Sequence, residues 1–211
     1  MTATSALQRL QSLPSVFSGR DLTLRFQWTS KNASQYLYLW GRRGLVQALG
    51  GHSDTFANLV VQPRPDWEAC LRRAMPSALI VGIEALRRAA WVTQIPSRPE
   101  VAVDAAMPVY TVDHFTVLAR SGRWFEASAK GVQGGALAPA WALADMLSRE
   151  GWGVCGLMSD DIDWDRVSAR DRRQWSAACK AYGLVMEDQA CGFVMKDQAC
   201  GLVMDVKAVS A

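Results

Sequence analysis

Residues 21–40 read DLTLRFQWTSKNASQYLYLW, and two runs within this stretch alternate between side chains of different kinds. In DLTLRFQW every second residue is large and apolar, and in QYLYLW aromatic rings alternate with leucines. A period of two is typical of a strand with one buried face. The intervening TSKNAS has the small polar residues of a turn. The stretch therefore predicts a β-hairpin over residues 21–40.

A second hairpin is predicted at residues 109–130, turning at Arg120-Ser121-Gly122-Arg123. Helical periodicity marks several other segments. Asp66 precedes WEACLRRAM as a helix start, Gly151 follows LAPAWALADMLSRE as a helix stop, and one long helix is expected over residues 164–182. Hairpins mixed with helices predict an α+β fold, with a largely antiparallel sheet built from the two hairpins and packed with four or more helices.

The composition is that of a globular protein. Of 211 residues, 50% are hydrophobic and 20% are charged. A single domain is expected over residues 1–182, with a possible hinge near 95–108. Residues 183–211 are expected to form a tail, since GLVMEDQAC at 183–191 is followed by the near-copy GFVMKDQAC. A period of nine residues suits neither a strand nor a helix, so the copies indicate an in-frame duplication where additions are tolerated.

The chain is expected to act in the cytoplasm, away from any membrane. No apolar run reaches the roughly 18 residues of a membrane span, and the N-terminus lacks a basic start followed by a long apolar stretch. The five cysteines form no CxxC pair, which favours reduced thiols.

Basic residues gather in two places that suit a polyanion. Arg166, Arg170 and Arg173 have the spacing of one face of the helix expected at 164–182, and guanidinium groups in a row suit phosphate contacts. In the first hairpin, Tyr36, Tyr38 and Trp40 would project from one face beside Arg42 and Arg43, where aromatic rings can stack on nucleobases. These eight residues are the predicted nucleic-acid site.

The function predicted from the sequence is that of a nucleic-acid-binding accessory or regulatory protein without catalysis. The choice between DNA and RNA stays open, and no cofactor or metal is predicted. Asp161, Asp163 and Asp165 alternate, but Arg166 stands where a calcium loop needs glycine.

Two alternatives to this function remain open. A chain with nine tryptophans could be an interaction subunit of a larger protein complex, since aromatic residues are enriched in protein interfaces. A small enzyme could use His52 or His114 as an acid or base.

Overall fold

The computed structural model describes residues 5–184, and these fold into eight α-helices and two β-sheets. The chain divides into two compact units. Of the described residues, unit 1 comprises 5–78 and 107–117, and unit 2 comprises 79–106 and 118–184. The α+β fold is confirmed. The single domain predicted over 1–182 and the hinge near 95–108 stay predictions, and all but the first two residues of the predicted tail lie outside the described part.

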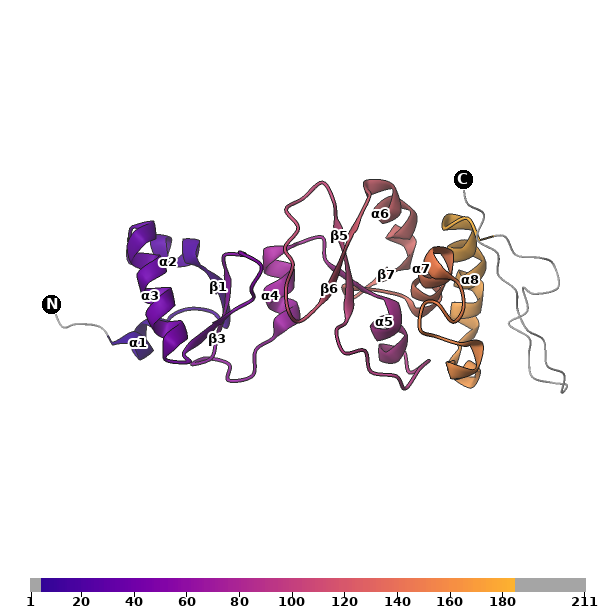
Figure 1. Ribbon diagram of the computed structural model, residues 1–211, viewed down its shortest axis with the longest axis horizontal. Helices are drawn as coiled ribbons and strands as arrows, with labels where there is room; N and C mark the ends of the chain where they lie inside the picture. The colour runs from indigo at the N-terminus through magenta and orange to yellow at the C-terminus, as the bar shows by residue number, and fades with distance from the viewer. Residues whose placement is uncertain (1–4, 185–211) are drawn as a thin grey trace, which may run out of the picture. The chain divides into compact units, whose positions relative to one another are not determined.

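Unit 1 contains four helices and a three-stranded antiparallel sheet (Figure 1). The helices are α1 (Ala6–Gln11), α2 (Gly19–Phe26), α3 (Ser30–Arg42) and α4 (Trp67–Ala74). The strands β1 (Val16–Ser18), β2 (Val46–Ala48) and β3 (Thr55–Asn58) lie in the order β1-β3-β2. Phe17 pairs with Phe56, and Gln47 pairs with Ala57, so β3 is the central strand.

The core of unit 1 lies between its first three helices and the sheet. The buried side chains are those of Leu10, Leu13, Phe17, Leu22, Ala33, Leu37, Trp40 and Val46. Asn58 is also fully buried, and its amide donates to the carbonyl oxygens of Leu10 at 2.8 Å and Pro14 at 3.2 Å. This amide ties the end of α1 to the central strand, and it is satisfied as a buried polar group must be.

Unit 2 has a five-stranded sheet in the order β6-β5-β4-β8-β7. The strands are β4 (Leu79–Val81), β5 (Glu100–Asp104), β6 (Thr116–Arg120), whose first two residues belong to unit 1, β7 (Val132–Gln133) and β8 (Ala136–Leu137). β4 pairs antiparallel with β5 and parallel with β8. The helices are α5 (Gly82–Arg88), α6 (Gly122–Ser128), α7 (Pro139–Glu150) and α8 (Ala169–Ala181), with 3-10 turns at Ala129–Gly131, Ser159–Asp161 and Trp164–Arg166.

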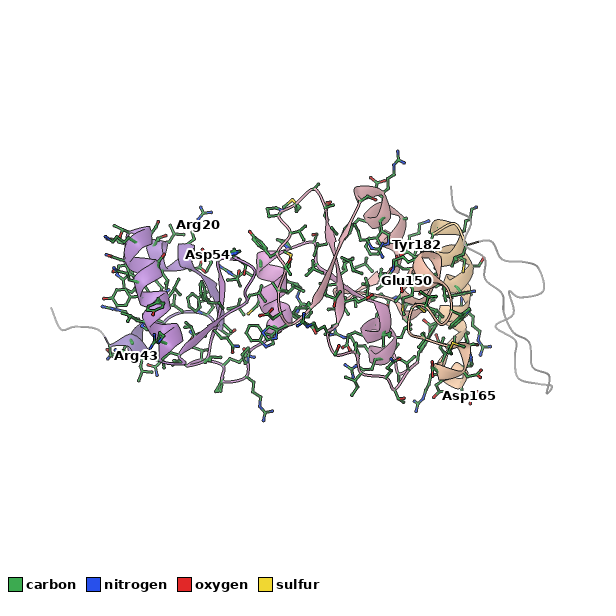
Figure 2. The ribbon with its side chains drawn as sticks, viewed as in Figure 1. Arg20, Arg43, Asp54, Glu150, Asp165 and Tyr182 are labelled. Atoms are coloured by element: carbon green, nitrogen blue, oxygen red, sulfur yellow. The ribbon has the colours of Figure 1, made fainter. Side chains whose placement is uncertain are left out.

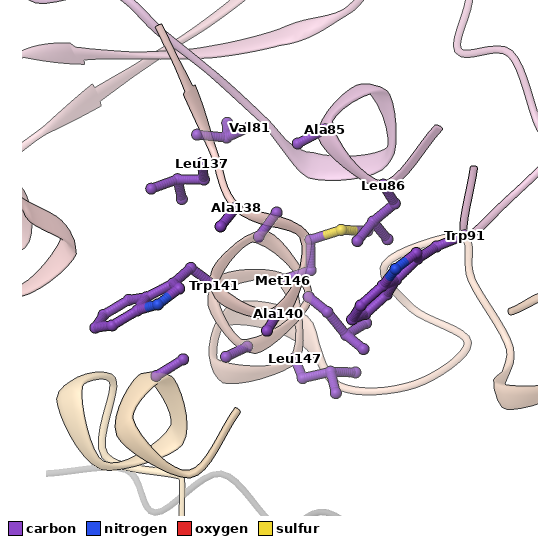
Figure 3. Packing of buried hydrophobic residues seen from close by; sticks show 14 of the residues in the cluster. Val81, Ala85, Leu86, Trp91, Leu137, Ala138, Ala140, Trp141, Met146 and Leu147 are labelled. Carbon is purple, nitrogen blue, oxygen red and sulfur yellow. The ribbon is translucent and has the colours of Figure 1, made fainter. Parts of the chain in front are cut away.

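Helix α7 is the centre of the core of unit 2. Eight of its residues are buried, and it packs on α5 on one side and α8 on another (Figure 3). Trp141 and Leu147 of α7 lie among Val81, Leu86 and Trp91 in one cluster (Figure 3). The predicted stop at Gly151 is confirmed, since this residue ends α7 with a φ of 72° that favours glycine.

The hairpin predicted at 21–40 is wrong, because this stretch forms α2 and α3. Leu24, expected on the buried face of a strand, is 69% exposed, whereas Leu22 is fully buried. Ala33, Leu37 and Trp40 are buried at the spacing of a helix face. Thr29, expected in a turn, instead caps α3, since its hydroxyl accepts from the amide of Asn32 at 3.2 Å.

The hairpin predicted at 109–130 is also wrong in its second arm. β6 is present, but Ser121 ends the strand and caps α6 by accepting from the amide of Trp124. The polar residues expected to form a hairpin turn are therefore a helix start. β6 lies beside β5 at the edge of the sheet of unit 2, and each sheet also contains a pairing between strands far apart in the sequence, β1 with β3 and β4 with β8.

Candidate nucleic-acid interface

α2 and α3 form a helix-turn-helix in unit 1. A turn of three residues, Gln27–Trp28–Thr29, joins them, and Gln27 has the left-handed backbone that ends α2, with a φ of 54°. Two helices joined by so short a turn are the arrangement in which the second helix of DNA-binding proteins enters the major groove. α3 stands in that second position.

The outward face of α3 consists of Lys31, Gln35, Tyr38 and Arg42, which we call the α3 face. All four side chains are exposed. Their spacing of four, three and four residues places them on one side of the helix, opposite the buried Ala33, Leu37 and Trp40. Arg42 donates from Nη1 to the hydroxyl oxygen of Tyr38 at 3.2 Å, which fixes the two side chains together. The face therefore presents hydrogen-bond donors and positive charge.

The electrostatics of the motif favour an anion. Residues 22–53, which lie between Asp21 of α2 and Asp54 of the loop after β2, contain four Lys/Arg and no Asp/Glu. Over unit 1 as a whole there are nine Lys/Arg and five Asp/Glu. An uninterrupted basic stretch on a helix and its neighbours is the electrostatic footprint expected for contact with phosphates.

A hairpin loop follows α3, and we call its residues 49–54 the wing. It connects β2 to β3, and α3 contacts β2. His52 lies exposed in this loop with a φ of 61°. Position 51 has no room for a side chain, since a Cβ on Gly51 would lie 2.2 Å from the carbonyl oxygen of Thr111. The segment 107–117 of unit 1 therefore supports the wing from behind.

At its far end the wing meets the start of α2. Asp54 accepts from the backbone amide of Arg20 at 3.2 Å, and Figure 2 shows the two residues close together. A carboxylate at the first turn of a helix is favourable, because the free amides there carry partial positive charge. Ser18 caps the same turn. The first turn of α2, where the helix-turn-helix begins, is thus fixed to the wing.

Three of the eight predicted site residues are placed differently from the prediction. Trp40 is 1% exposed and belongs to the core of unit 1. Tyr36 is half-buried and stacks on Trp28, with ring centroids 4.2 Å apart. Arg166 lies in the 3-10 turn Trp164–Arg166 outside α8, because Ser168 caps the helix at Ala169. The first two aromatic rings therefore hold α3 in place instead of offering a platform for bases.

The other five predicted residues are exposed on helices or at their ends. Tyr38 and Arg42 lie on the α3 face, and Arg43 follows as the cap residue of α3 (Figure 2). Arg170 and Arg173 share the exposed side of α8. Arg166 is also exposed, and it faces Asp163 with 3.5 Å between Nε and Oδ2. Tyr38, Arg42 and Arg43 belong to unit 1, whereas the three arginines at 166, 170 and 173 belong to unit 2.

The sequence prediction missed Lys31 and Gln35, because the hairpin interpretation placed the first in a turn and the second directly after it. The signal that could have found them is the pair of helix caps. Ser18 and Asp21 form a capping box, and Thr29 stands before a run in which apolar residues recur every three or four positions. Reading helices from those caps gives the α3 face directly.

Neither histidine lies in an arrangement that indicates catalysis. His114 is half-buried and stacks on Trp67 with ring centroids 3.9 Å apart, while His52 is exposed in the wing. Burial raises the pKa of the Cys70 thiol to about 11, which keeps it protonated and unreactive. Within residues 5–184 no group of three or more His, Cys, Asp and Glu side chains could hold a metal ion.

Unit 2 contains a buried ionic network around Asp145 of α7. This carboxylate is 1% exposed and accepts from Arg120 Nη2 at 2.9 Å and from Trp124 Nε1 at 2.8 Å. Arg149 approaches it at 3.3 Å and also binds Glu100 at 3.1 Å. Nearby, burial raises the pKa of Tyr182 to about 12, and its hydroxyl lies 2.7 Å from that of Ser128. The network joins β5, β6, α6 and α7, which indicates a structural role.

Comparisons with known proteins give no family. No family model matches the sequence, and no curated protein matches it. A search of solved structures finds a likeness to the crystal structure of the RV2827C protein from Mycobacterium tuberculosis. The identity is 14%, the TM-score is 0.47, and the match covers 82% of this chain and 74% of that chain. None of the helices in the described part is long and apolar enough to cross a membrane.

Proposed function

We propose that the chain binds double-stranded DNA through the helix-turn-helix of unit 1, as an accessory or regulatory protein without catalytic activity. The observation that carries the proposal is the α3 face. It is an exposed basic and hydrogen-bonding side of the second helix of the motif, within 32 residues that contain no carboxylate side chain. The wing adds the exposed His52.

Helix insertion favours duplex DNA over RNA. The major groove of B-form DNA is about 12 Å wide and admits an α-helix, whereas that of A-form RNA is too narrow. The first half of α3, with Lys31, Asn32 and Gln35, carries side chains that can hydrogen-bond to base edges. The amide groups of Asn and Gln suit adenine, and the ammonium group of Lys suits guanine. At the other end of α3, Arg42 and Arg43 suit backbone phosphates.

The test is a titration of fluorescently labelled nucleic acids with the full chain at several salt concentrations. Three or four phosphate contacts predict that log K falls with log[salt] with a slope of roughly −3. Duplex DNA should bind more tightly than double-stranded RNA or single strands of the same sequence. Absence of binding to duplex DNA at low salt, or tighter binding to RNA, would refute the proposal.

Substitution of the two charges of the α3 face should weaken DNA binding. For Lys31→Ala combined with Arg42→Ala, we expect at least a tenfold loss of affinity, and a salt slope shallower by about 1 for the lost phosphate contact of Arg42. Arg64→Ala, which removes an exposed charge elsewhere in unit 1, is the control and should bind as wild type does. An unchanged affinity of the double variant measured by fluorescence anisotropy would remove α3 from the interface.

The basic side of α8 stays a second proposed contact with the DNA backbone. No ion-pair partner of Arg170 or Arg173 is found among the described residues, and both side chains are exposed. We expect Arg170→Ala with Arg173→Ala to weaken binding to all duplexes alike, with a salt slope shallower by about 2. Arg98→Ala, an exposed arginine of the same unit, is the control. If the slope of the double variant equals that of wild type, α8 does not contact DNA.

A further inference from the structure

We propose that Arg9 of α1 is a positioning residue for α3, acting through a cation–π contact with the turn of the helix-turn-helix. The proposal rests on the function proposed above and concerns how that site is held in shape. The guanidinium carbon of Arg9 lies 5.1 Å from the ring centroid of Trp28 and 5.2 Å from that of Tyr36. One cation therefore lies against two rings at once.

One ring lies in the turn of the helix-turn-helix and the other lies in α3. Trp28 is the middle residue of the turn between α2 and α3, and Tyr36 lies in the second turn of α3. Their rings stack at an interplanar angle of 17°. Trp28 also packs on Phe26, at the end of α2, with centroids 4.9 Å apart, and on Trp40 at 6.0 Å. Any tilt of α3 relative to the turn would separate rings that Arg9 holds together.

The half-buried Arg9 has no carboxylate partner among the described residues. α1 itself is short, with six residues, and is fixed by a capping box between Ser5 and Gln8. A guanidinium close to the faces of aromatic rings is attracted by them, and the attraction grows as the group is desolvated. Such an attraction is enough to favour one orientation of a helix end over its neighbours.

Loss of a positioning residue and loss of a phosphate contact should change different measured quantities. A lost phosphate contact weakens binding to every duplex and makes the salt slope shallower by about 0.9. A misplaced α3 loses its fit to base edges, so it weakens the preferred duplex and leaves the background affinity and the salt slope as they were. The conservative Arg9→Lys variant keeps the charge near the rings and should retain most of the function.

The experiment compares the full-length wild type with Arg9→Gln, Arg9→Lys and the control Arg64→Gln. The probes are a duplex selected by the wild type from a random pool and a scrambled duplex. For Arg9→Gln we expect about fivefold weaker binding to the selected duplex, matching a cation–π contact of about 1 kcal/mol. Binding to the scrambled duplex, the salt slope and the control should be unchanged, and Arg9→Lys should restore most of the loss.

Each other outcome overturns the proposal. A salt slope shallower by about one, with equal losses for both duplexes, would make Arg9 a phosphate contact. A lower melting temperature with unchanged affinity at low temperature would make it a structural residue only. If the wild type binds no duplex at low salt, the proposed function fails together with this role, and if it binds duplexes but selects none from the pool, only the role of Arg9 fails. If the wild type binds and Arg9→Gln binds equally, only the role of Arg9 fails.

Discussion

Replacing Asp145 with alanine is expected to lower the free energy of unfolding by about 3–5 kcal/mol, the range found when one partner of a buried ion pair is removed. The carboxylate accepts from Arg120 and Trp124 and lies beside Arg149, all within 3.3 Å. Without it, the Arg120 side chain, which is 18% exposed, keeps its charge with no compensating anion. Urea unfolding of the full chain followed by circular dichroism measures the loss.

The control for this change is Asp160→Ala, since Asp160 is exposed in a 3-10 turn of the same unit. It should alter the stability by less than about 0.5 kcal/mol, as surface substitutions do. Asp145→Asn tests charge separately, because the amide keeps the shape of the side chain but not its negative charge. A loss below about 1 kcal/mol for Asp145→Ala would contradict the role given to the network.

Replacing Trp40 with alanine is the second large effect, with an expected loss of about 3–5 kcal/mol in stability. The ring is 1% exposed and packs against Trp28 of the turn and Tyr36 of the same helix, with centroids 6.0 Å and 5.6 Å away. Its removal leaves a cavity that the short helices of unit 1 fill only in part. Thermal and urea unfolding of the full chain would both show the loss.

Tyr38→Ala is the matched control for Trp40, because Tyr38 is 63% exposed on the same helix. It should change stability by less than about 0.5 kcal/mol and instead weaken DNA binding. One outcome would instead support the prediction made from the sequence, that Trp40 belongs to the nucleic-acid site. A stable Trp40→Ala variant that no longer binds nucleic acid would mean that Trp40 stacks on bases and is not part of the core.

The sequence predicts the fold class and some helix ends but not the helix-turn-helix. The start of α4 at Asp66 is confirmed, and so is the stop of α7 at Gly151, because both depend on local chemistry at helix ends. Residues 21–40 fit two periods at once. Leu22 and Phe26 are four residues apart, which places both side chains on one face in a strand and also in a helix. A run of eight residues is too short to distinguish the two periods.

The sequence predicts the candidate site in part, for a similar reason. Tyr38, Arg42 and Arg43 are exposed as predicted, but they lie on a helix and at its end instead of on a strand. Trp40 is misplaced because alternation gives it the same face as Tyr38. The contact of Arg9 with Trp28 and Tyr36 joins residues 19 and 27 positions apart, so no local pattern contains it. Contacts of this kind follow only from the packing of α1 on the motif.

The most direct test of DNA binding through α3 is site-specific photocrosslinking to a duplex bound by the full chain. A photoreactive side chain in place of Gln35, exposed on the α3 face, is compared with the same group in place of Ser176, exposed on α8. We expect efficient crosslinking from position 35 at low salt, lost when the salt concentration is raised enough to dissociate the complex. Crosslinking from position 176 alone, with none from position 35, would contradict DNA binding through α3.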